Sequence, residues 1–249
     1  MPKMELIKKL KDDPLSKVYL VSINAKLFVQ KIVPVVFIHE FYKQKYLAGV
    51  CKSVKIPRVY SIKKQGKIAY CLMEYIPHKK VKSESVVLKV ISKFHKDTQN
   101  VRSNCFVRYD FNRFYQDFLV AKSYLPKVLL GMSKSELCAF FKPVFASKYS
   151  IVHGDFHEDQ VFKSDKYCLI DFISAFYGPS VLDFAYFFKY AKPKGRRWNT
   201  MFFRKALIAI IIFDIAWLIN RRKYEHIPSK QISNASRVIL KNLKKISLR

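Results

Sequence analysis

IVHGDFHEDQVFKSDKYCLIDFISAFYGPSVLDFAYFF, residues 151–188, is the stretch that decides the fold. Two runs rich in β-branched and aromatic residues, 149–152 and 167–170, predict short buried strands with a polar turn between them. One carboxylate follows each run, Asp155 after the first and Asp171 after the second. Such a pair suits phosphoryl transfer, where one carboxylate orients or deprotonates an attacking hydroxyl group and another holds Mg²⁺ on the nucleotide phosphates.

The motifs of this stretch resemble those of a known group of enzymes. HGDFHEDQ and LIDF are similar to the HGDxHxxN and IDF motifs of the aminoglycoside/choline kinase-like group and its RIO-type relatives. These families have the protein-kinase-like fold, so the resemblance implies an α+β protein with two lobes: a small antiparallel sheet with one helix, then a mainly helical lobe. We expect residues 1–77 to form the nucleotide-binding lobe and residues 78–249 the lobe with the catalytic loop, together one kinase-like domain.

The resemblance also implies roles for single residues. Asp155 is then the catalytic residue and Asp171 a metal ligand, with His153 as structural support. Gln160 stands five residues beyond Asp155, where the family carries a metal-binding Asn. Its carbonyl oxygen can still bind a metal, although one methylene group displaces it. Asp183 in VLDFAYFF resembles the Asp of the family's DLA helix, whose expected role is to brace the catalytic loop.

Two other interpretations apply to the same residues. The two Asp residues can be ordinary loop carboxylates whose neighbouring histidines merely pack. His153, Asp155 and His157 can also suggest a zinc site, but no Cys or further His recurs nearby at ligand spacing. The agreement of several motif positions favours the kinase-like interpretation.

The N-terminal part of the chain predicts a nucleotide site. Strand-like runs at residues 17–23 and 27–32, joined by three residues, predict a hairpin. Lys31 in FVQKI resembles the lysine of the kinase VAIK strand, which reaches the α- and β-phosphates of ATP. Glu40 stands seven residues before Leu47, as in the family's E-x₆-L pattern, and is the expected ion-pair partner of Lys31.

The expected adenine site is the segment MEYIP, which resembles the family's hinge. Backbone groups near Glu74 and Ile76 are expected to hydrogen-bond adenine. No glycine occurs in LKDDPLSKVYLV, residues 10–21, where kinases carry a glycine-rich loop that lets backbone N–H groups approach phosphates. Either Ser16 and Lys17 supply these contacts or the phosphates are held more loosely.

Charge is the outlier of the composition. The chain has 47 Lys and Arg against 18 Asp and Glu, a formal net charge of +29. Such a surplus repels itself unless a polyanion neutralises it, so the expected partner is RNA, above all tRNA, or an anionic membrane surface. A solvated lysine-rich surface is the alternative. The residues expected to bind RNA are Lys194, Arg196, Arg197, Trp198, Arg221, Arg222 and Lys223.

The sequence predicts a cytoplasmic protein without a transmembrane segment. The five Cys are scattered, form no CxxC pair, and indicate small core residues in a reducing compartment, with no disulfide. The segment MPKMELIKKLKDD is charged and lacks the apolar core of a signal peptide. Residues 206–219 are apolar but too short to cross a bilayer about 30 Å thick, and Asp214 interrupts them, so we expect a buried helix.

These observations predict an enzyme that uses ATP and Mg²⁺ to transfer the γ-phosphoryl group to a hydroxyl group. The charge favours an RNA acceptor. Such an enzyme would be similar to the RIO-related archaeal tRNA kinases, which phosphorylate a ribose 2′-hydroxyl. A small-molecule or lipopolysaccharide-core sugar kinase at an anionic membrane is the alternative, to which HGDFH itself is closer. A pseudokinase that only binds is the second alternative. Residues 101–148 match no motif, so they can be either acceptor surface or helical core.

Overall fold

The computed structural model describes residues 4–13, 15–77, 79–81, 83–101, 103–189, 200–221 and 229–247. These residues form two compact units, and each is described by itself. The first unit takes its residues from Met1–Thr98, Arg102–Cys105 and His157–Ala175, and the second from Gln99–Val101, Phe106–Phe156 and Phe176–Arg249. The predicted division into functional lobes at residues 77 and 78 stays a proposal.

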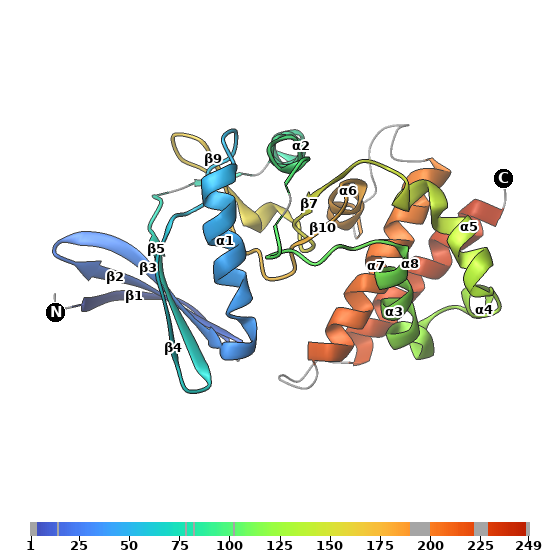
Figure 1. Ribbon diagram of the computed structural model, residues 1–249, viewed down its shortest axis with the longest axis horizontal. Coiled ribbons are helices and arrows are strands. Elements are labelled where there is room, and N and C mark those ends of the chain that lie inside the picture. The colour runs from blue at the N-terminus through green and yellow to red at the C-terminus, as the bar shows by residue number, and fades with distance from the viewer. Residues whose placement is uncertain are drawn as a thin grey trace. The chain divides into compact units, whose positions relative to one another are not determined.

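A five-stranded antiparallel sheet dominates the first unit (Figure 1). Its strands, in spatial order, are β1 (Met4–Asp13), β2 (Ser16–Ile23), β3 (Lys26–Pro34), β5 (Ile68–Glu74) and β4 (Val59–Gln65). The hairpin predicted from the sequence is formed by β2 and β3. Its turn holds Asn24 and Ala25 at φ values of 51° and 61°, and Asn suits the first of these because it enters the left-handed region more readily than most residues.

Strand β1 was not predicted from the sequence. It pairs with β2 from Met4 opposite Ile23 to Asp13 opposite Ser16. Its residues are exposed as far as Asp12, so β1 has no buried face and lacks the alternation of apolar and polar residues that marks a half-buried strand. As an edge strand it is held by main-chain hydrogen bonds to one neighbour, and its lysines are typical of such edges.

Helix α1 packs against this sheet. Pro34 is followed by one 3₁₀ turn, η1 (Val35–Phe37), and then by α1 (His39–Val50), so the α-helix begins later than the proline alone predicts. Phe41 of α1 is fully buried in a cluster with Val33 of β3. The helix also buries three polar side chains, Glu40, Lys43 and Gln44. Buried polar groups need hydrogen-bond or ion-pair partners, so these three side chains indicate that α1 makes polar contacts with other elements as well as apolar ones.

The first unit also contains a small second sheet and a long helix. The strands are β6 (Lys79–Lys80), β8 (Val161–Lys163) and β9 (Tyr167–Leu169), and the helix is α2 (Glu84–Thr98). Strand β9 is the second of the two strands predicted around the carboxylates. A 3₁₀ turn, η3 (Glu158–Gln160), leads into β8. The β8–β9 hairpin therefore delivers Asp171 to the loop that follows it.

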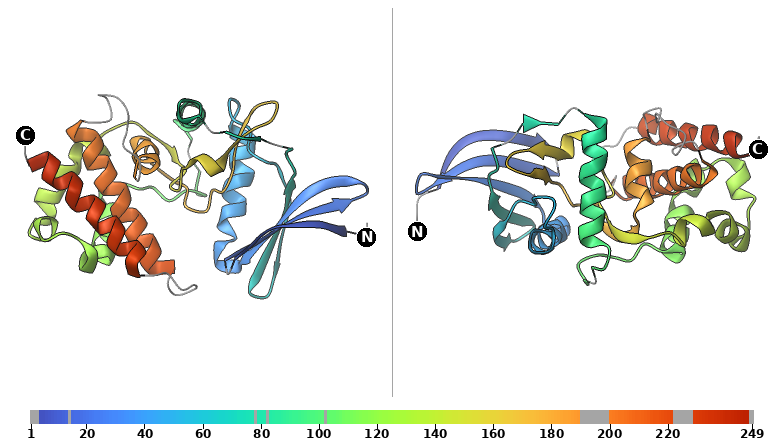
Figure 2. Two further views of the ribbon diagram at one scale, coloured as in Figure 1. Left: turned by 180° about the vertical axis from the view of Figure 1, so that it is seen from behind. Right: turned by 90° about the horizontal axis from the view of Figure 1, so that it is seen from above.

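The second unit is mainly helical, as predicted, and is built around α7. Its helices are α3 (Phe111–Ala121), α4 (Lys127–Leu130), α5 (Lys134–Phe145), α6 (Val181–Phe187), α7 (Met201–Arg221) and α8 (Ser229–Ser247), with a 3₁₀ turn, η2 (Lys122–Tyr124). Strand β7 (Tyr149–Val152), the first of the predicted strands, pairs antiparallel with β10 (Phe176–Pro179). Helix α7 contacts α3, α5, α6 and α8, and Figure 2 shows α7 and α8 side by side.

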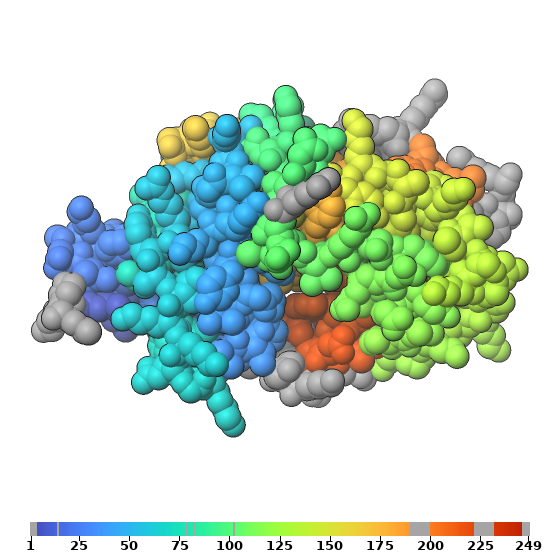
Figure 3. Space-filling view, viewed as in Figure 1, coloured from blue at the N-terminus to red at the C-terminus, as the bar shows by residue number. Residues whose placement is uncertain are grey.

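The apolar run at residues 206–219 lies within α7 and is a buried core helix, as expected. Its residues are buried almost throughout because other helices surround it. Figure 3 shows α3, α4 and α5, in green to yellow-green, over one face of this unit. Residues 101–148 thus supply core, and their Phe114 and Phe141 have ring centroids 4.7 Å apart. In the part of the chain that the structure describes, no helix is long and apolar enough to cross a membrane.

The buried carboxylate of Asp117 on α3 makes the stability of the second unit depend on pH. Burial raises the pKa of Asp117 to about 6, although the Arg113 guanidinium opposes this shift. The folded state therefore holds the proton at a pH where the unfolded state has lost it. The free energy of unfolding must fall as the pH rises from about 4 to about 6, because the buried carboxyl group becomes ionised.

We predict that Asp117→Asn removes the contribution of Asp117 to this fall, which amounts to roughly 2 to 3 kcal/mol. Urea unfolding followed by tryptophan fluorescence, at several pH values between 4 and 7, measures it. Asp110→Asn is the matched control, since Asp110 caps α3 through the backbone N–H of Arg113 and Asn caps equally well. An Asp117→Asn profile as steep as that of wild type would contradict the assignment.

Candidate active site

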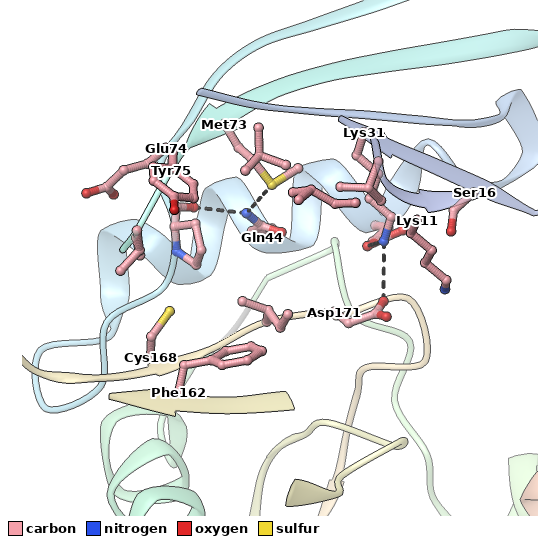
Figure 4. A pocket seen from close by; sticks show the side chains of 17 residues that line it. Lys11, Ser16, Lys31, Gln44, Met73, Glu74, Tyr75, Phe162, Cys168 and Asp171 are labelled. Atoms are coloured by element: carbon pink, nitrogen blue, oxygen red, sulfur yellow. Dashed lines mark hydrogen bonds and ion pairs between the residues drawn. The ribbon is translucent and has the colours of Figure 1, made fainter. Parts of the chain in front are cut away.

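A cavity of about 370 Å³ lies in the first unit (Figure 4). Its apolar lining comes from the large sheet and from the β8–β9 hairpin and includes Val18, Val29, Met73, Phe162 and Ile170. Figure 4 shows polar side chains gathered at one end, Lys11, Ser16, Lys31 and Asp171. Glu74 and Tyr75 lie at the other end. An apolar slot with a lysine ammonium and carboxylates gathered at one end suits a ligand that joins an aromatic group to an anion.

The charged end is organised by Lys31 of β3. Its Nζ donates a hydrogen bond to a carboxylate oxygen of Glu40 on α1 and lies 3.4 Å from Oδ1 of Asp171. The side chains of Lys31 and Glu40 are 13% and 1% exposed, so both charges are almost fully removed from water. Burying charges is costly unless each has a close partner of opposite sign. These contacts therefore join a strand, a helix and the loop after β9 at one point.

The ionisation of this cluster follows from its burial and its charges. Burial opposes the charged form of Lys31, but Asp171 and Glu40 raise the pKa of Lys31 above its usual value. Burial raises the pKa of Glu40 to about 6, although Lys31 acts to lower it. The second carboxylate oxygen of Glu40 is buried without a hydrogen-bond partner among the described residues. The groups in direct contact are one ammonium and two carboxylates, and the buried ammonium of Lys43 on α1 adds a second positive charge that acts on Glu40.

Asp171 has the features of a metal ligand. Its backbone is held in the left-handed region at φ 69°, where Asp is tolerated better than most residues and where functional positions are enriched. Lys43 of α1 fixes the same loop by donating to the carbonyl oxygen of Ile173 at 3.0 Å, and burial lowers the pKa of Lys43 to about 8. The Asp171 side chain is 27% exposed, and Mg²⁺ prefers oxygen ligands such as carboxylates. A magnesium ion therefore fits this carboxylate.

Gln160, the second predicted metal ligand, closes η3 and is buried. Its Nε2 atom lies 3.1 Å from Nε2 of His157. This contact uses the amide nitrogen and not the carbonyl oxygen through which Gln160 is expected to bind metal. Among the residues that the structure describes, no group of three or more His, Cys, Asp or Glu is placed to hold a metal ion, so the zinc interpretation gains no support.

The glycine-free turn between β1 and β2 is closed by Asp13. Its Oδ1 accepts hydrogen bonds from the backbone N–H groups of Leu15 and Ser16 at 2.9 and 2.7 Å. Its Oδ2 lies 2.7 Å from Nζ of Lys11. Lys11 and Ser16 line the cavity, whereas Lys17 does not and is exposed. The carboxylate of Asp13 thus already occupies the hydrogen-bond donors at this turn, and a bound anion would have to replace it.

The opposite end of the cavity holds the residues predicted to bind adenine. Glu74 ends β5, and both Glu74 and Ile76 line the cavity. The Glu74 carboxylate lies 2.9 Å from Nζ of Lys55 and accepts from the backbone N–H of Arg58 at 3.2 Å. Its own N–H donates to the Arg58 carbonyl oxygen at 2.8 Å. The side chain of Glu74 therefore holds the end of the strand, and contacts between its backbone and adenine stay a prediction.

In the second unit, the loop after β7 is held by Asp183 in the first turn of α6. The two carboxylate oxygens of Asp183 accept from the backbone N–H groups of His153 at 2.7 Å and Gly154 at 3.0 Å. The side chains of His153 and Asp183 are fully buried. Gly154 adopts φ 80°, which favours glycine because a side chain would clash there. The loop conformation is thus determined directly before Asp155.

Asp155 itself accepts a hydrogen bond from the hydroxyl group of Tyr186 on α6, with 2.6 Å between the oxygens. Sequence reasoning missed Tyr186. The signal was present, because Tyr186 stands three residues after Asp183 and side chains at that spacing share one face of a helix. A polar residue at this spacing from a residue expected to brace the loop was a candidate for a second contact with it.

The residues predicted to bind RNA lie mostly outside the described part of the chain. These are Lys194, Arg196, Arg197, Trp198, Arg222 and Lys223. Arg221 ends α7, and its guanidinium carbon lies 4.2 Å from the centre of the Trp217 ring. The prediction of an RNA-binding surface therefore rests on the sequence.

Comparison with known proteins supports the kinase-like architecture. Residues 17–221 match the phosphotransferase enzyme family. A thermostable mutant of aminoglycoside phosphotransferase APH(4)-Ia, solved as a ternary complex with ADP and hygromycin B, is 12% identical, with a TM-score of 0.64 over 97% of this chain and 94% of that chain. A putative fructosamine-3-kinase from Haemophilus somnus 129PT is 17% identical, with a TM-score of 0.62 over 97% and 92%. Plasmodium vivax ethanolamine kinase is 13% identical, with a TM-score of 0.62 over 96% and 80%.

These comparisons confirm the two-lobed kinase-like fold, whereas the suggested likeness to tRNA kinases is not supported by them. No curated protein matches the chain by sequence. The family match spans most of the chain and includes Lys31, Asp155 and Asp171. The chain therefore belongs to the phosphotransferase enzyme family.

Proposed function

We propose that the chain transfers the γ-phosphoryl group of ATP to a hydroxyl group of a small molecule. The observation that carries this proposal is the cluster of Lys31, Glu40 and Asp171 at the charged end of an apolar cavity. An apolar slot accepts adenine, and the cluster supplies an ammonium for phosphates next to a carboxylate for a metal. The family match adds the reaction class.

On the nucleotide side, Lys31 binds the α- and β-phosphates and Glu40 holds its ammonium in position. Asp171 binds Mg²⁺, and Gln160 contributes its carbonyl oxygen. When bound, the metal neutralises charge on the phosphate oxygens and orients them. Backbone groups near Glu74 and Ile76 bind adenine.

On the acceptor side, Asp155 orients or deprotonates the attacking hydroxyl group. Asp183 and His153 hold the loop, because Asp183 bonds the backbone of the two residues before Asp155. General base catalysis depends on such positioning, since a base must lie within hydrogen-bonding reach of the proton that it takes.

The names of the structural relatives support a small acceptor. They are a phosphotransferase in complex with hygromycin B, an ethanolamine kinase and a putative fructosamine-3-kinase. The net charge of +29 favours an acceptor that is anionic or that is presented at an anionic membrane surface, because such a surface attracts basic proteins. A lipopolysaccharide-core sugar combines both properties.

RNA is the second candidate acceptor, and one observation favours it. A surplus of 47 basic over 18 acidic residues steers a protein toward polyanions, and tRNA is one. Of the residues proposed to bind it, Arg221 lies in the described part of the chain, stacked on Trp217. The family match and the intact Lys31, Asp155 and Asp171 weigh against a pseudokinase.

The proposal predicts transfer of label from γ-labelled ATP to amino sugars, amino alcohols or lipopolysaccharide core, and not to total tRNA. Asp155→Ala and Asp171→Ala lower the rate by about 100-fold or more, the scale of acid–base and metal contributions. Asp165→Ala is the matched control, because Asp165 is an exposed acid between these two positions.

Labelled tRNA, with loss of label in both variants, would overturn the small-molecule proposal in favour of RNA. Equal activity of Asp171→Ala and wild type would contradict the assignment of the metal ligand. The Asp165→Ala control separates either result from a general effect of removing an acid.

The Asp13 turn generates a prediction about nucleotide affinity. Asp13→Asn keeps an oxygen that can accept from the N–H groups of Leu15 and Ser16 but removes the charge that opposes phosphates. We expect Mg·ATP to bind about two- to fivefold more tightly, the scale of a partly exposed charge pair, with no change for adenosine. Isothermal titration calorimetry measures both ligands.

Asp12→Asn is the control, because Asp12 pairs with Lys9 on the same strand. Neither Asp12 nor Asp13 lines the cavity, but Asp13 holds the backbone of Ser16, which does. Weaker binding of Mg·ATP by Asp13→Asn would mean that Asp13 orders the turn for binding instead of competing with the phosphates.

A further inference from the structure

We propose that Tyr186, Lys189 and Asp214 form a relay of contacts that positions Asp155, with Tyr186 as the positioning residue and the other two holding it. The proposal rests on the proposed catalytic role of Asp155. It assigns a function to a buried ion pair in the second unit that the reaction described above does not use. All four residues belong to this one unit.

The first contact of the relay joins Tyr186 to Asp155. The Tyr186 hydroxyl donates to Oδ1 of Asp155 at 2.6 Å, a distance typical of a hydrogen bond from a hydroxyl group to a charged carboxylate. This bond restricts rotation of the carboxylate about its Cβ–Cγ axis. One oxygen is engaged by Tyr186, so the other oxygen is the one that receives the acceptor hydroxyl.

The second and third contacts join Tyr186 to α7. Nζ of Lys189 lies 3.9 Å from the centre of the Tyr186 ring and 3.0 Å from Oδ2 of Asp214. A cation on the ring face holds the ring in place and draws electron density from it, which makes the hydroxyl group a better donor. The side chains of Lys189 and Asp214 are 5% and 11% exposed. The ammonium is therefore fixed between the ring and the carboxylate.

The position of Asp214 in the chain indicates that this ion pair does more than stabilise the core. It is the acidic residue that interrupts the apolar run at residues 206–219, and an ion pair in such a place is weak evidence for stability, since an apolar pair of similar size packs as well. Burial raises the pKa of Asp214, while the Lys189 ammonium lowers it and the negative charge of Asp155 raises it further. The pKa of Asp214 therefore depends on Asp155 as well as on Lys189.

A rival account makes Lys189 and Asp214 an ordinary core ion pair and leaves Tyr186 to pack. The two accounts differ in what Tyr186 responds to. In the relay, the environment of the Tyr186 ring depends on both the carboxylate of Asp155 and the ion pair, and removal of the ion pair changes the position of the Asp155 carboxylate through Tyr186.

The first test places 3-fluorotyrosine at position 186 of the full chain and records its ¹⁹F NMR resonance without nucleotide. The relay predicts a shifted resonance in Asp155→Asn and in the double variant Lys189→Met/Asp214→Leu. The double variant removes both charges together, so neither is left buried alone and the core remains packed. Asp110→Asn is the control for loss of a carboxylate in this unit and leaves the resonance unchanged.

The second test measures turnover of Mg·ATP with the acceptor identified as above. Tyr186→Phe lowers kcat about tenfold, the scale of a hydrogen bond to a charged group, with an unchanged KM for ATP. The triple variant that adds Lys189→Met and Asp214→Leu to Tyr186→Phe loses no more than Tyr186→Phe alone, because the pair acts through the ring. Tyr149→Phe is the control, since it loses a hydroxyl group from a ring that also carries a cation, Arg108 at 5.6 Å.

The relay is overturned if the fluorine resonance of Asp155→Asn coincides with that of wild type. Turnover of Tyr186→Phe equal to wild type, or additive losses in the triple variant, overturns it as well. The proposed function fails separately, when wild type transfers no label from ATP. In that case the fluorine resonances alone decide between the relay and the rival account.

Discussion

The contact of buried Lys31 with Glu40 and Asp171 is the interaction on which the first unit depends. Lys31 is fixed by the register of β3, Glu40 by the packing of α1 and Asp171 by the loop after β9. None of these side chains would be stable in a buried site alone, so the ion pairs hold three elements together at the place where phosphates are expected. The second carboxylate oxygen of Glu40 has no hydrogen-bond partner among the described residues, and the partly exposed carboxylate of Asp171 is a ligand of the kind that Mg²⁺ prefers.

Carboxylates hold the other functional loops through the backbone. Asp13 accepts from two N–H groups in the β1–β2 turn, and Asp183 accepts from two in the loop before Asp155. Asp97 does the same for the segment after α1, where Lys52 and Ser53 donate at 2.8 and 2.6 Å. The chain has only 18 acidic residues against 47 basic ones. Several of these acidic residues accept hydrogen bonds from backbone N–H groups that would otherwise need a partner.

The sequence predicted the structure correctly where apolar residues follow a regular pattern or where the backbone needs a particular residue type. The β2–β3 hairpin, the apolar run of α7 and the glycine before Asp155 all have such signals. Strand β1 has none, because an exposed edge strand is held by its backbone and not by an apolar face. The Asp13 turn could have been inferred from Asp-Pro-Leu-Ser, since Asp side chains often bond the backbone two residues on. The contact of Lys189 with Asp214 could not, because it joins residues 25 positions apart through packing that no local pattern encodes.

The most direct test of the account is the binding of Mn²⁺, as a paramagnetic substitute for Mg²⁺, measured by electron paramagnetic resonance with and without ATP. The account predicts a protein–Mn²⁺–ATP complex in wild type that Asp171→Asn weakens about tenfold or more, with Asp165→Asn unchanged. Equal binding of Mn²⁺ and ATP by wild type and Asp171→Asn would contradict the claim that the Lys31, Glu40 and Asp171 cluster is the metal–nucleotide site.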